Sequence, residues 1–350
     1  MASALMGLLS AGVAPATASA QTRTNVYFVG SGGQGLIGRV YQPNLSGAPA
    51  GYKPPGMVLM HGCSGMWSYN TPPTVTCSGG SCTVSTSEVA QSHIEKWGRK
   101  LSAAGYVALA VDSYTTRTPT GPGPGPYPTP AQYQHQCHGD TYAGAVDPYT
   151  TRVDDFLSAK SRLSSTYNVN VHGVGELGWS QGAEATLVSA AATPVNNNTE
   201  WCDISSMQCV GRTLTQPTAS VVFYPGCGPN LGYGYDDDDP LNIDPGYWRP
   251  DVPMRWNHGE ADGTTPFAPC DLRVDEAVST YGASIDFDHY ASVDHSFDMY
   301  VSGEDPSIYA FPTAKCSPAD TVTYPSKCAR WDADIDSLAF IQSNVQGYTP

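Results

Sequence analysis

The stretch that decides the fold is residues 173–192, which read GVGELGWSQGAEATLVSAAA. The apolar run at 173–179 predicts a buried strand, and the Ala-rich run at 182–192 predicts a helix. Between them, residues 178–182 (GWSQG) match G-x-S-x-G, in which glycines permit a sharp turn that exposes the serine hydroxyl. A glycine-lined turn around an ordinary serine is the alternative. The position between a strand and a helix favours Ser180 as a nucleophile.

The same alternation of strands and helices extends over the rest of the chain. Predicted strands cover residues 25–30, 36–41, 56–61, 106–111, 173–179, 219–224, 253–258 and 284–290, and further predicted helices cover 87–104, 149–164 and 332–343. This pattern predicts a doubly wound, mostly parallel α/β sheet with its functional site outside the carboxyl ends of the strands. Without internal repeats, residues 21–350 are expected to form one domain with long loop insertions.

A serine hydroxyl needs a neighbouring base, and the base needs an acid that orients it. Asp262 lies in the loop after the seventh predicted strand, and His295 lies in the loop after the eighth. The chain order serine, acid, histidine therefore predicts Ser180 as nucleophile, Asp262 as orienting acid and His295 as base. Glu260 and Asp294 are alternative acids, but Asp262 is farther past its strand and nearer the apex of its loop.

Acyl transfer also needs hydrogen-bond donors for the negative oxygen of the intermediate. Residues 61–65 (HGCSG) directly follow a predicted strand, so the backbone N–H groups of Cys63 and Gln181 are the predicted donors; a plain turn is the alternative. The aromatic residues near these segments, Trp179, Trp67 and Tyr69, are predicted to line a substrate cleft, with packing as the alternative.

Ten cysteines, an even number with no C-x-x-C pair, favour disulfides over a zinc site. The predicted pairs are Cys77–Cys82, Cys202–Cys209, Cys316–Cys328, Cys227–Cys270 and Cys63–Cys137. Residues 1–20 carry no charge and end in a small-x-small pattern, although the basic start of a signal peptide is missing. We therefore expect a signal peptide and a secreted or periplasmic protein, with a flexible Ala/Ser-rich tail as the alternative.

The net charge of the chain limits the classes of molecule that it is expected to bind. Lys and Arg number 17 against 32 Asp and Glu, so the net charge is −15, which argues against nucleic acid. No apolar run reaches the roughly 20 residues of a membrane span. The acidic run at 236–239 is expected to be a solvated loop rather than a calcium site. The predicted chemistry requires no metal or cofactor, and we expect a monomer.

Six segments in order resemble the dienelactone hydrolase branch of the α/β-hydrolases: 61–65 (HGCSG), 105–113 (GYVALAVDS), 178–182 (GWSQG), 224–227 (YPGC), 258–262 (HGEAD) and 295–297 (HSF). The resemblance spans about residues 25–345 and implies the α/β-hydrolase fold with the Ser180, His295 and Asp262 roles given above. The namesake enzymes use a cysteine nucleophile, whereas this chain has Ser180. The difference favours hydrolysis of carboxylic esters in general. The aromatic cleft predicted above would suit aryl esters or polyesters, and release of acetyl or feruloyl groups from plant polysaccharide is an equal candidate. A non-catalytic binding protein and a peptidase are the alternatives.

Overall fold

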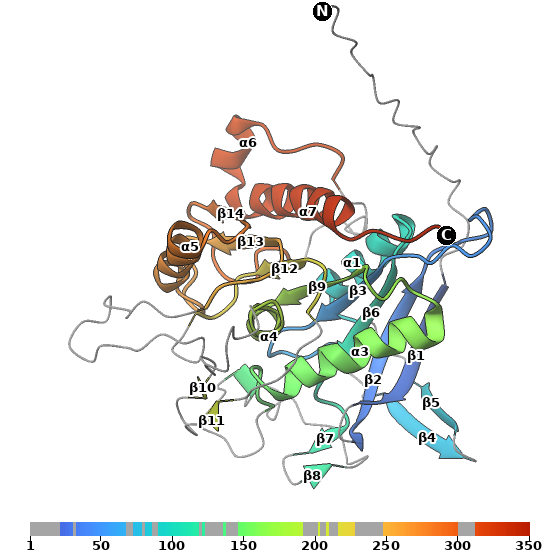
Figure 1. Ribbon diagram of the computed structural model, residues 1–350. Coiled ribbons are helices and arrows are strands. Elements are labelled where there is room, and N and C mark those ends of the chain that lie inside the picture. Colours follow the sequence, from blue (N-terminus) through green and yellow to red (C-terminus); the bar gives the residue numbers. More distant parts are fainter. Residues whose placement is uncertain are drawn as a thin grey trace, which may run out of the picture.

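An eight-stranded sheet forms the centre of the computed structural model (Figure 1). In spatial order it contains β1 (Thr22–Val29), β2 (Gly35–Gln42), β6 (Val107–Asp112), β3 (Gly56–Met60), β9 (Val174–Trp179), β12 (Ser220–Phe223), β13 (Met254–Gly259) and β14 (Ile285–Tyr290). The pairs β1–β2 and β2–β6 are antiparallel, and all other neighbours are parallel. The predicted doubly wound, mostly parallel sheet is confirmed.

The structure describes residues 22–30, 33–67, 73–78, 81–85, 90–118, 121–122, 136–137, 146–191, 202–203, 208–209, 216–227, 248–299 and 312–350. The predicted signal peptide at 1–20 and the acidic run at 236–239 lie outside these ranges. Within them, no helix is long and apolar enough to cross a bilayer. The same part of the chain contains no group of three His, Cys, Asp or Glu side chains placed to hold a metal ion.

Helices cover both faces of the sheet, and β6 shows why. Val107, Leu109 and Val111 point into one hydrophobic cluster, while Ala108 and Ala110 point into the other. Because successive side chains of a strand face opposite sides, a strand buried on both faces reads as a continuous apolar run. The first cluster is shared with α3 (Thr151–Tyr167), α4 (Gln181–Ser189) and α5 (Phe267–Tyr281), and the second with α1 (Ser92–Ala103) and α7 (Pro325–Asn344).

Three helices near the carboxyl-terminal end of the chain differ from the sequence-based expectation. Helix α5 was not predicted, although the parallel pair β13–β14 requires a crossover connection. Its buried residues Cys270, Arg273, Val274 and Ala277 follow helical spacing, but the stripe contains a charged residue and is therefore weak as a hydrophobic signal. Helix α7 begins at Pro325, before the predicted start at 332, and the short α6 (Pro318–Thr323) precedes it.

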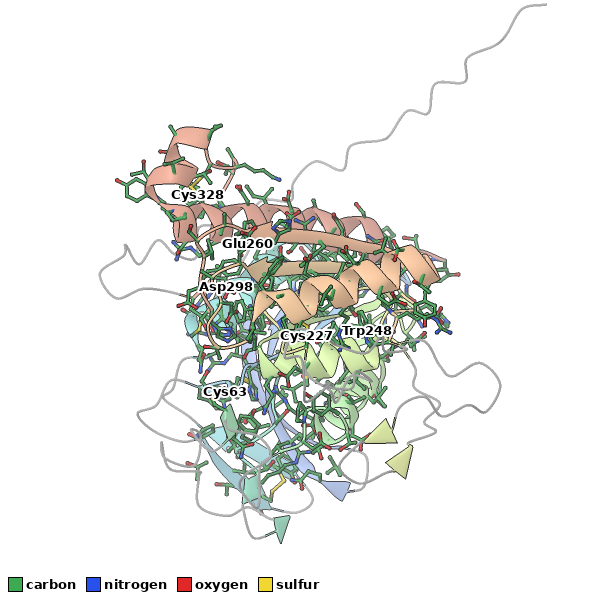
Figure 2. All side chains as sticks on the ribbon, turned by 90° about the vertical axis from the view of Figure 1, so that its left-hand side faces the viewer. Cys63, Cys227, Trp248, Glu260, Asp298 and Cys328 are labelled. Atoms are coloured by element: carbon green, nitrogen blue, oxygen red, sulfur yellow. A yellow bond between two sulfur atoms is a disulfide. The ribbon has the colours of Figure 1, made fainter. Side chains whose placement is uncertain are left out.

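The loop insertions contain short hairpins and disulfides. The hairpins are β4 (Thr74–Ser78) with β5 (Ser81–Ser85), β7 (Arg117–Thr118) with β8 (Gly121–Pro122), and β10 (Cys202–Asp203) with β11 (Gln208–Cys209). Four of the predicted disulfides are present, Cys63–Cys137, Cys77–Cys82, Cys227–Cys270 and Cys316–Cys328. In Figure 2, Cys63, Cys227 and Cys328 lie at three separate levels of the molecule. Cys202 and Cys209 face each other in the backbone pairing, but their side chains lie outside the description.

Candidate active site

Ser180 lies at the turn between β9 and α4, with φ of 51° and ψ of −122°. Few residues other than glycine adopt a positive φ, because Cβ then crowds the backbone. Its N–H donates to the carbonyl of Phe223 on β12 (2.9 Å), which fixes the turn at the end of the sheet. A Cβ at Gly182 would collide with the carbonyl oxygens of Met60 and His61. The glycine therefore lets the first turn of α4 pack against the end of β3.

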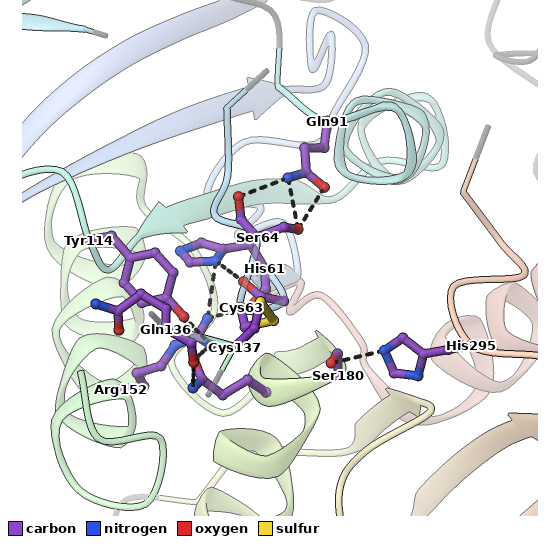
Figure 3. The surroundings of a disulfide bond; sticks show 12 residues. His61, Cys63, Ser64, Gln91, Tyr114, Gln136, Cys137, Arg152, Ser180 and His295 are labelled. Carbon is purple, nitrogen blue, oxygen red and sulfur yellow. Dashed lines mark hydrogen bonds between the residues drawn. A yellow bond between two sulfur atoms is a disulfide. The ribbon is translucent and has the colours of Figure 1, made fainter. Parts of the chain in front are cut away.

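Ser180, His295 and Asp262 form one line of hydrogen bonds. His295 Nε2 lies 3.1 Å from Ser180 Oγ, and His295 Nδ1 lies 2.8 Å from Asp262 Oδ2 (Figure 3 shows the Ser180–His295 pair). The three residues come from the loops after β9, β14 and β13, at the carboxyl ends of parallel strands. Of the alternative acids, Glu260 pairs with His289 Nδ1 (2.6 Å), and Asp294 Oδ1 accepts from the N–H groups of Gly263 and His295. Asp262 is thus the carboxylate at the His295 ring.

The loop after β13 holds Asp262 as an anion. Burial alone would raise the pKa of Asp262, but hydrogen bonds from His295 and from the N–H groups of Thr265 and Thr264 lower the pKa below its usual value. The two backbone bonds to Oδ1 measure 2.8 and 2.9 Å. An ionised carboxylate only accepts, so Nδ1 of His295 carries the proton. The Nε2 lone pair then faces the Ser180 hydroxyl.

Thr265 is a neighbour of this line that sequence reasoning missed. Its hydroxyl lies 2.9 Å from Asp262 Oδ2, 3.1 Å from His295 Nδ1 and 3.1 Å from the carbonyl of Tyr224. The carbonyl of Thr265 accepts a bond from buried His258 Nε2 (2.9 Å). Thr265 therefore connects the Asp262 loop to the segment that follows β12.

A second missed residue, Asp298, anchors the His295 loop in the core. Its carboxylate accepts from Trp179 Nε1 (2.7 Å) and from the hydroxyl of Tyr224. The Tyr224 ring in turn lies 4.5 Å, centroid to centroid, from the ring of His295. Buried tyrosine and tryptophan polar groups need such partners. Asp298, labelled in Figure 2, thus links the residue before Ser180 to the loop that carries His295.

The structure places the predicted substrate-contacting tryptophans in the core. Trp179 is 1% exposed, and Trp67 is 3% exposed. The Trp67 N–H donates to Asp112 Oδ2 (2.6 Å), and the guanidinium of Arg39 lies 4.8 Å from the ring centroid of Trp67. Neither ring presents a surface to a substrate in this structure. Tyr69, the third predicted contact, lies outside the described residues.

The two segments with the predicted oxyanion donors meet at Ser180. A Cβ at Gly62 would lie 3.4 Å from Ser180 Cβ, so the chain just before Cys63 passes beside the serine. Gln181 is the first residue of α4. The Cys63–Cys137 disulfide ties the first segment to residues 136–137 (Figure 3). The carbonyl of Gln136 accepts a hydrogen bond from Gln181 Nε2 (2.8 Å). One dipeptide of the long insertion therefore contacts both segments.

The structure as a whole superposes on solved structures. A protein described as a dienelactone hydrolase from Klebsiella pneumoniae subsp. pneumoniae superposes with a TM-score of 0.51 at 14% identity, covering 93% of this chain and 99% of that one. The chain has the α/β-hydrolase fold. A dienelactone hydrolase-like promiscuous phosphotriesterase from metagenomic libraries matches with a TM-score of 0.51 at 15% identity and the same coverages. An acylaminoacyl peptidase matches with a TM-score of 0.50 at 11% identity, covering 95% of this chain and 43% of that one.

These matches confirm the predicted resemblance to dienelactone hydrolase-like α/β-hydrolases at the level of the fold. The fold hosts several chemistries, so at such low identity it does not assign an activity. No family model and no curated protein matches this sequence.

Proposed function

We propose that the protein is a serine hydrolase of carboxylic esters. The observation that carries the proposal is the line from Ser180 Oγ through His295 to Asp262, built on a serine with positive φ at the end of a parallel strand. A serine hydroxyl is a poor nucleophile by itself, and an adjacent oriented imidazole is the usual means of activating it. An unfavourable backbone conformation of this kind is typical of residues at functional sites, which supports the proposal.

In the proposed reaction, Ser180 Oγ attacks the ester carbonyl while His295 Nε2 takes the hydroxyl proton. Asp262 stabilises the imidazolium that forms and keeps the ring oriented. The backbone N–H groups of Cys63 and Gln181 receive the negative oxygen of the tetrahedral intermediate. His295 then gives its proton to the leaving alcohol, which leaves Ser180 acylated. Water, activated by the same imidazole, releases the acid and restores the hydroxyl.

The disulfides support a location outside the reducing cytosol. Four are present among the described residues, and Cys63–Cys137 tethers one of the proposed oxyanion segments. Disulfides persist in oxidising compartments, so we propose a secreted or periplasmic enzyme. A preference for aryl esters or polyesters stays a prediction.

Hydrolysis of p-nitrophenyl acetate, butyrate and octanoate by the wild type and by Ser180→Ala tests the proposal. We expect the substitution to lower kcat about a thousandfold or more. Ser343→Ala is the matched control, because its exposed hydroxyl donates to the carbonyl of Ala339 in its own helix. Equal activity of the wild type and Ser180→Ala would reject Ser180 as the nucleophile. No turnover by either would favour the binding-protein alternative.

Adding p-nitrophenyl benzoate, a polyester film and a p-nitroanilide to the panel of substrates compares the hydrolysis of aryl esters, polymeric esters and amides.

A further inference from the structure

Arg152 of α3 is fully buried and reaches both segments that carry the proposed oxyanion donors. Its Nη2 donates to the carbonyl of His61, two residues before Cys63. Its Nη1 donates to Gln181 Oε1 (3.1 Å). The hydroxyl of Tyr114 donates to the same Gln181 oxygen, so that oxygen accepts hydrogen bonds from two side chains, Tyr114 and Arg152, both labelled in Figure 3. A single guanidinium thus joins the loop after β3 to the first residue of α4.

Within the described part of the chain, no carboxylate forms an ion pair with the guanidinium of Arg152. The guanidinium instead contacts neutral oxygen atoms and the ring of His61. Three nearby acids feel the charge of Arg152 without forming an ion pair with it. Burial raises the pKa of Glu184 to about 7, and Arg152 counteracts that rise. Asp155 pairs in two bonds with Arg117 (2.6 and 2.7 Å). Burial raises the pKa of Glu176 to about 8, so this acid is mostly protonated at neutral pH. Burying a cation without a direct carboxylate contact is unfavourable, so the position of Arg152 needs an explanation.

His61 does not share this charge. Its Nε2 accepts from the N–H of Ser113 (3.1 Å), so Nδ1 carries the proton and donates to the carbonyl of Gly62 (2.6 Å). Burial and the neighbouring Arg152 hold the pKa of His61 well below its usual value, and the ring is neutral. The positive charge behind the oxyanion segments therefore resides on Arg152.

We infer that Arg152 is the positioning residue of the oxyanion hole in the ester hydrolase proposed above. By holding the His61 carbonyl and the Gln181 side chain, it keeps the N–H groups of Cys63 and Gln181 in fixed relative positions. Its charge also lies behind the point where negative charge develops, and a preorganised charge stabilises the transition state more than the ground state. Two acceptors on different segments require the fork of a guanidinium, which lysine lacks.

The test compares the wild type with Arg152→Met and Arg152→Lys. The concentration of competent enzyme is first measured with a fluorophosphonate that labels Ser180. We then measure kcat and KM on p-nitrophenyl butyrate, and the inhibition constant of an alkyl boronic acid, which forms a tetrahedral anionic adduct. For Arg152→Met we expect kcat and boronate affinity to fall together, by about tenfold to a hundredfold, with KM nearly unchanged. Arg152→Lys should recover part of the loss.

Arg255→Met is the control for loss of a buried arginine. Arg255 lies on β13, with its side chain 5% exposed, and pairs with Asp286 and Asp288 rather than with either oxyanion segment. A purely structural role of Arg152 predicts that both methionine variants lower the thermal midpoint while leaving kcat per labelled site and boronate affinity at wild-type values. That result for Arg152→Met would overturn the inference.

If Arg152→Met does not fold, a second variant tests whether Arg152 positions the oxyanion donors. Gln181→Met removes the acceptor of Arg152 Nη1 but keeps the backbone N–H of residue 181. We expect the same joint fall of kcat and boronate affinity, and wild-type values would overturn the inference. The Ser180→Ala assay separates the two proposals. If Ser180→Ala is inactive and the Arg152 variants are normal, only the role of Arg152 fails. If Ser180→Ala is fully active, both fail.

Discussion

Removing the Cys63–Cys137 disulfide should affect stability and catalysis by separable amounts. The two cysteines are 74 residues apart in the sequence, and loop-closure entropy for that separation gives about 4.5 kcal/mol of stabilisation at 25 °C. In Cys63→Ala/Cys137→Ala the backbone N–H of residue 63 remains, but its segment loses the tether to the insertion. Because complete loss of one oxyanion donor lowers kcat about 10²–10³-fold, a loosened donor should lower kcat about tenfold to a hundredfold.

Cys316→Ala/Cys328→Ala is the matched control. This disulfide spans 12 residues between the segment before α6 and the start of α7, and the same relation gives about 3 kcal/mol. Urea unfolding at equilibrium would measure both stability losses, and p-nitrophenyl butyrate hydrolysis would measure kcat and KM for each folded variant. We expect the control to lose stability only. If the folded Cys63→Ala/Cys137→Ala variant had the same kcat as the control, the proposed link between this disulfide and the oxyanion segment would be refuted.

Two further changes test the electrostatics. Asp262→Asn should lower kcat for ester hydrolysis about 10⁴-fold at unchanged KM, because an amide side chain no longer fixes the tautomer of His295. A loss of kcat below about tenfold would point to Glu260 or Asp294 as the orienting acid. Glu176→Gln should change the pH dependence of unfolding. The pKa of Glu176 is raised to about 8 in the folded protein, so the native state keeps a proton that the unfolded chain releases, and stability falls as pH rises from about 4.5 to about 8. Urea unfolding should therefore show Glu176→Gln similar to the wild type at about pH 4 and more stable at about pH 9; equal stability at the higher pH would contradict a protonated Glu176.

The strands were predictable because a parallel sheet covered on both faces needs continuous apolar segments. The predicted 106–111 and the observed Val107–Asp112 of β6 differ by one residue at each end. Helix α5 was missed because a half-exposed helix needs only a narrow buried stripe, and here the stripe includes Arg273. Short polar sequences such as the β4–β5 hairpin carry no such signal.

The sequence could predict that Ser180, Asp262 and His295 lie close together in space. Each residue follows the end of a strand, and the carboxyl ends of parallel strands meet at one edge of the sheet. The supporting residues could not be predicted, because their partners are distant in sequence. Arg152 lies 29 residues from Gln181 and on a different helix. No local pattern marks such a contact.

Trp179 shows how adjacency in sequence misleads. It precedes Ser180, which suggests a substrate contact, but it is also the last residue of β9. Side chains on a strand alternate between faces, and that of Trp179 points into the cluster shared with α1 and α7. The partner of its indole N–H, Asp298, is 119 residues away.

The positive φ of Ser180 also has a consequence for selection. A non-glycine residue in such a conformation destabilises the native state by about 1–3 kcal/mol, whereas glycine relieves most of that strain. Variants chosen for thermal resistance alone would therefore favour glycine at position 180, and under the proposed function such a protein would be more stable but would lack its nucleophile. If Ser180 is the nucleophile proposed here, a screen for stability has to measure ester hydrolysis in the same round, because stability and turnover would favour different residues at this position.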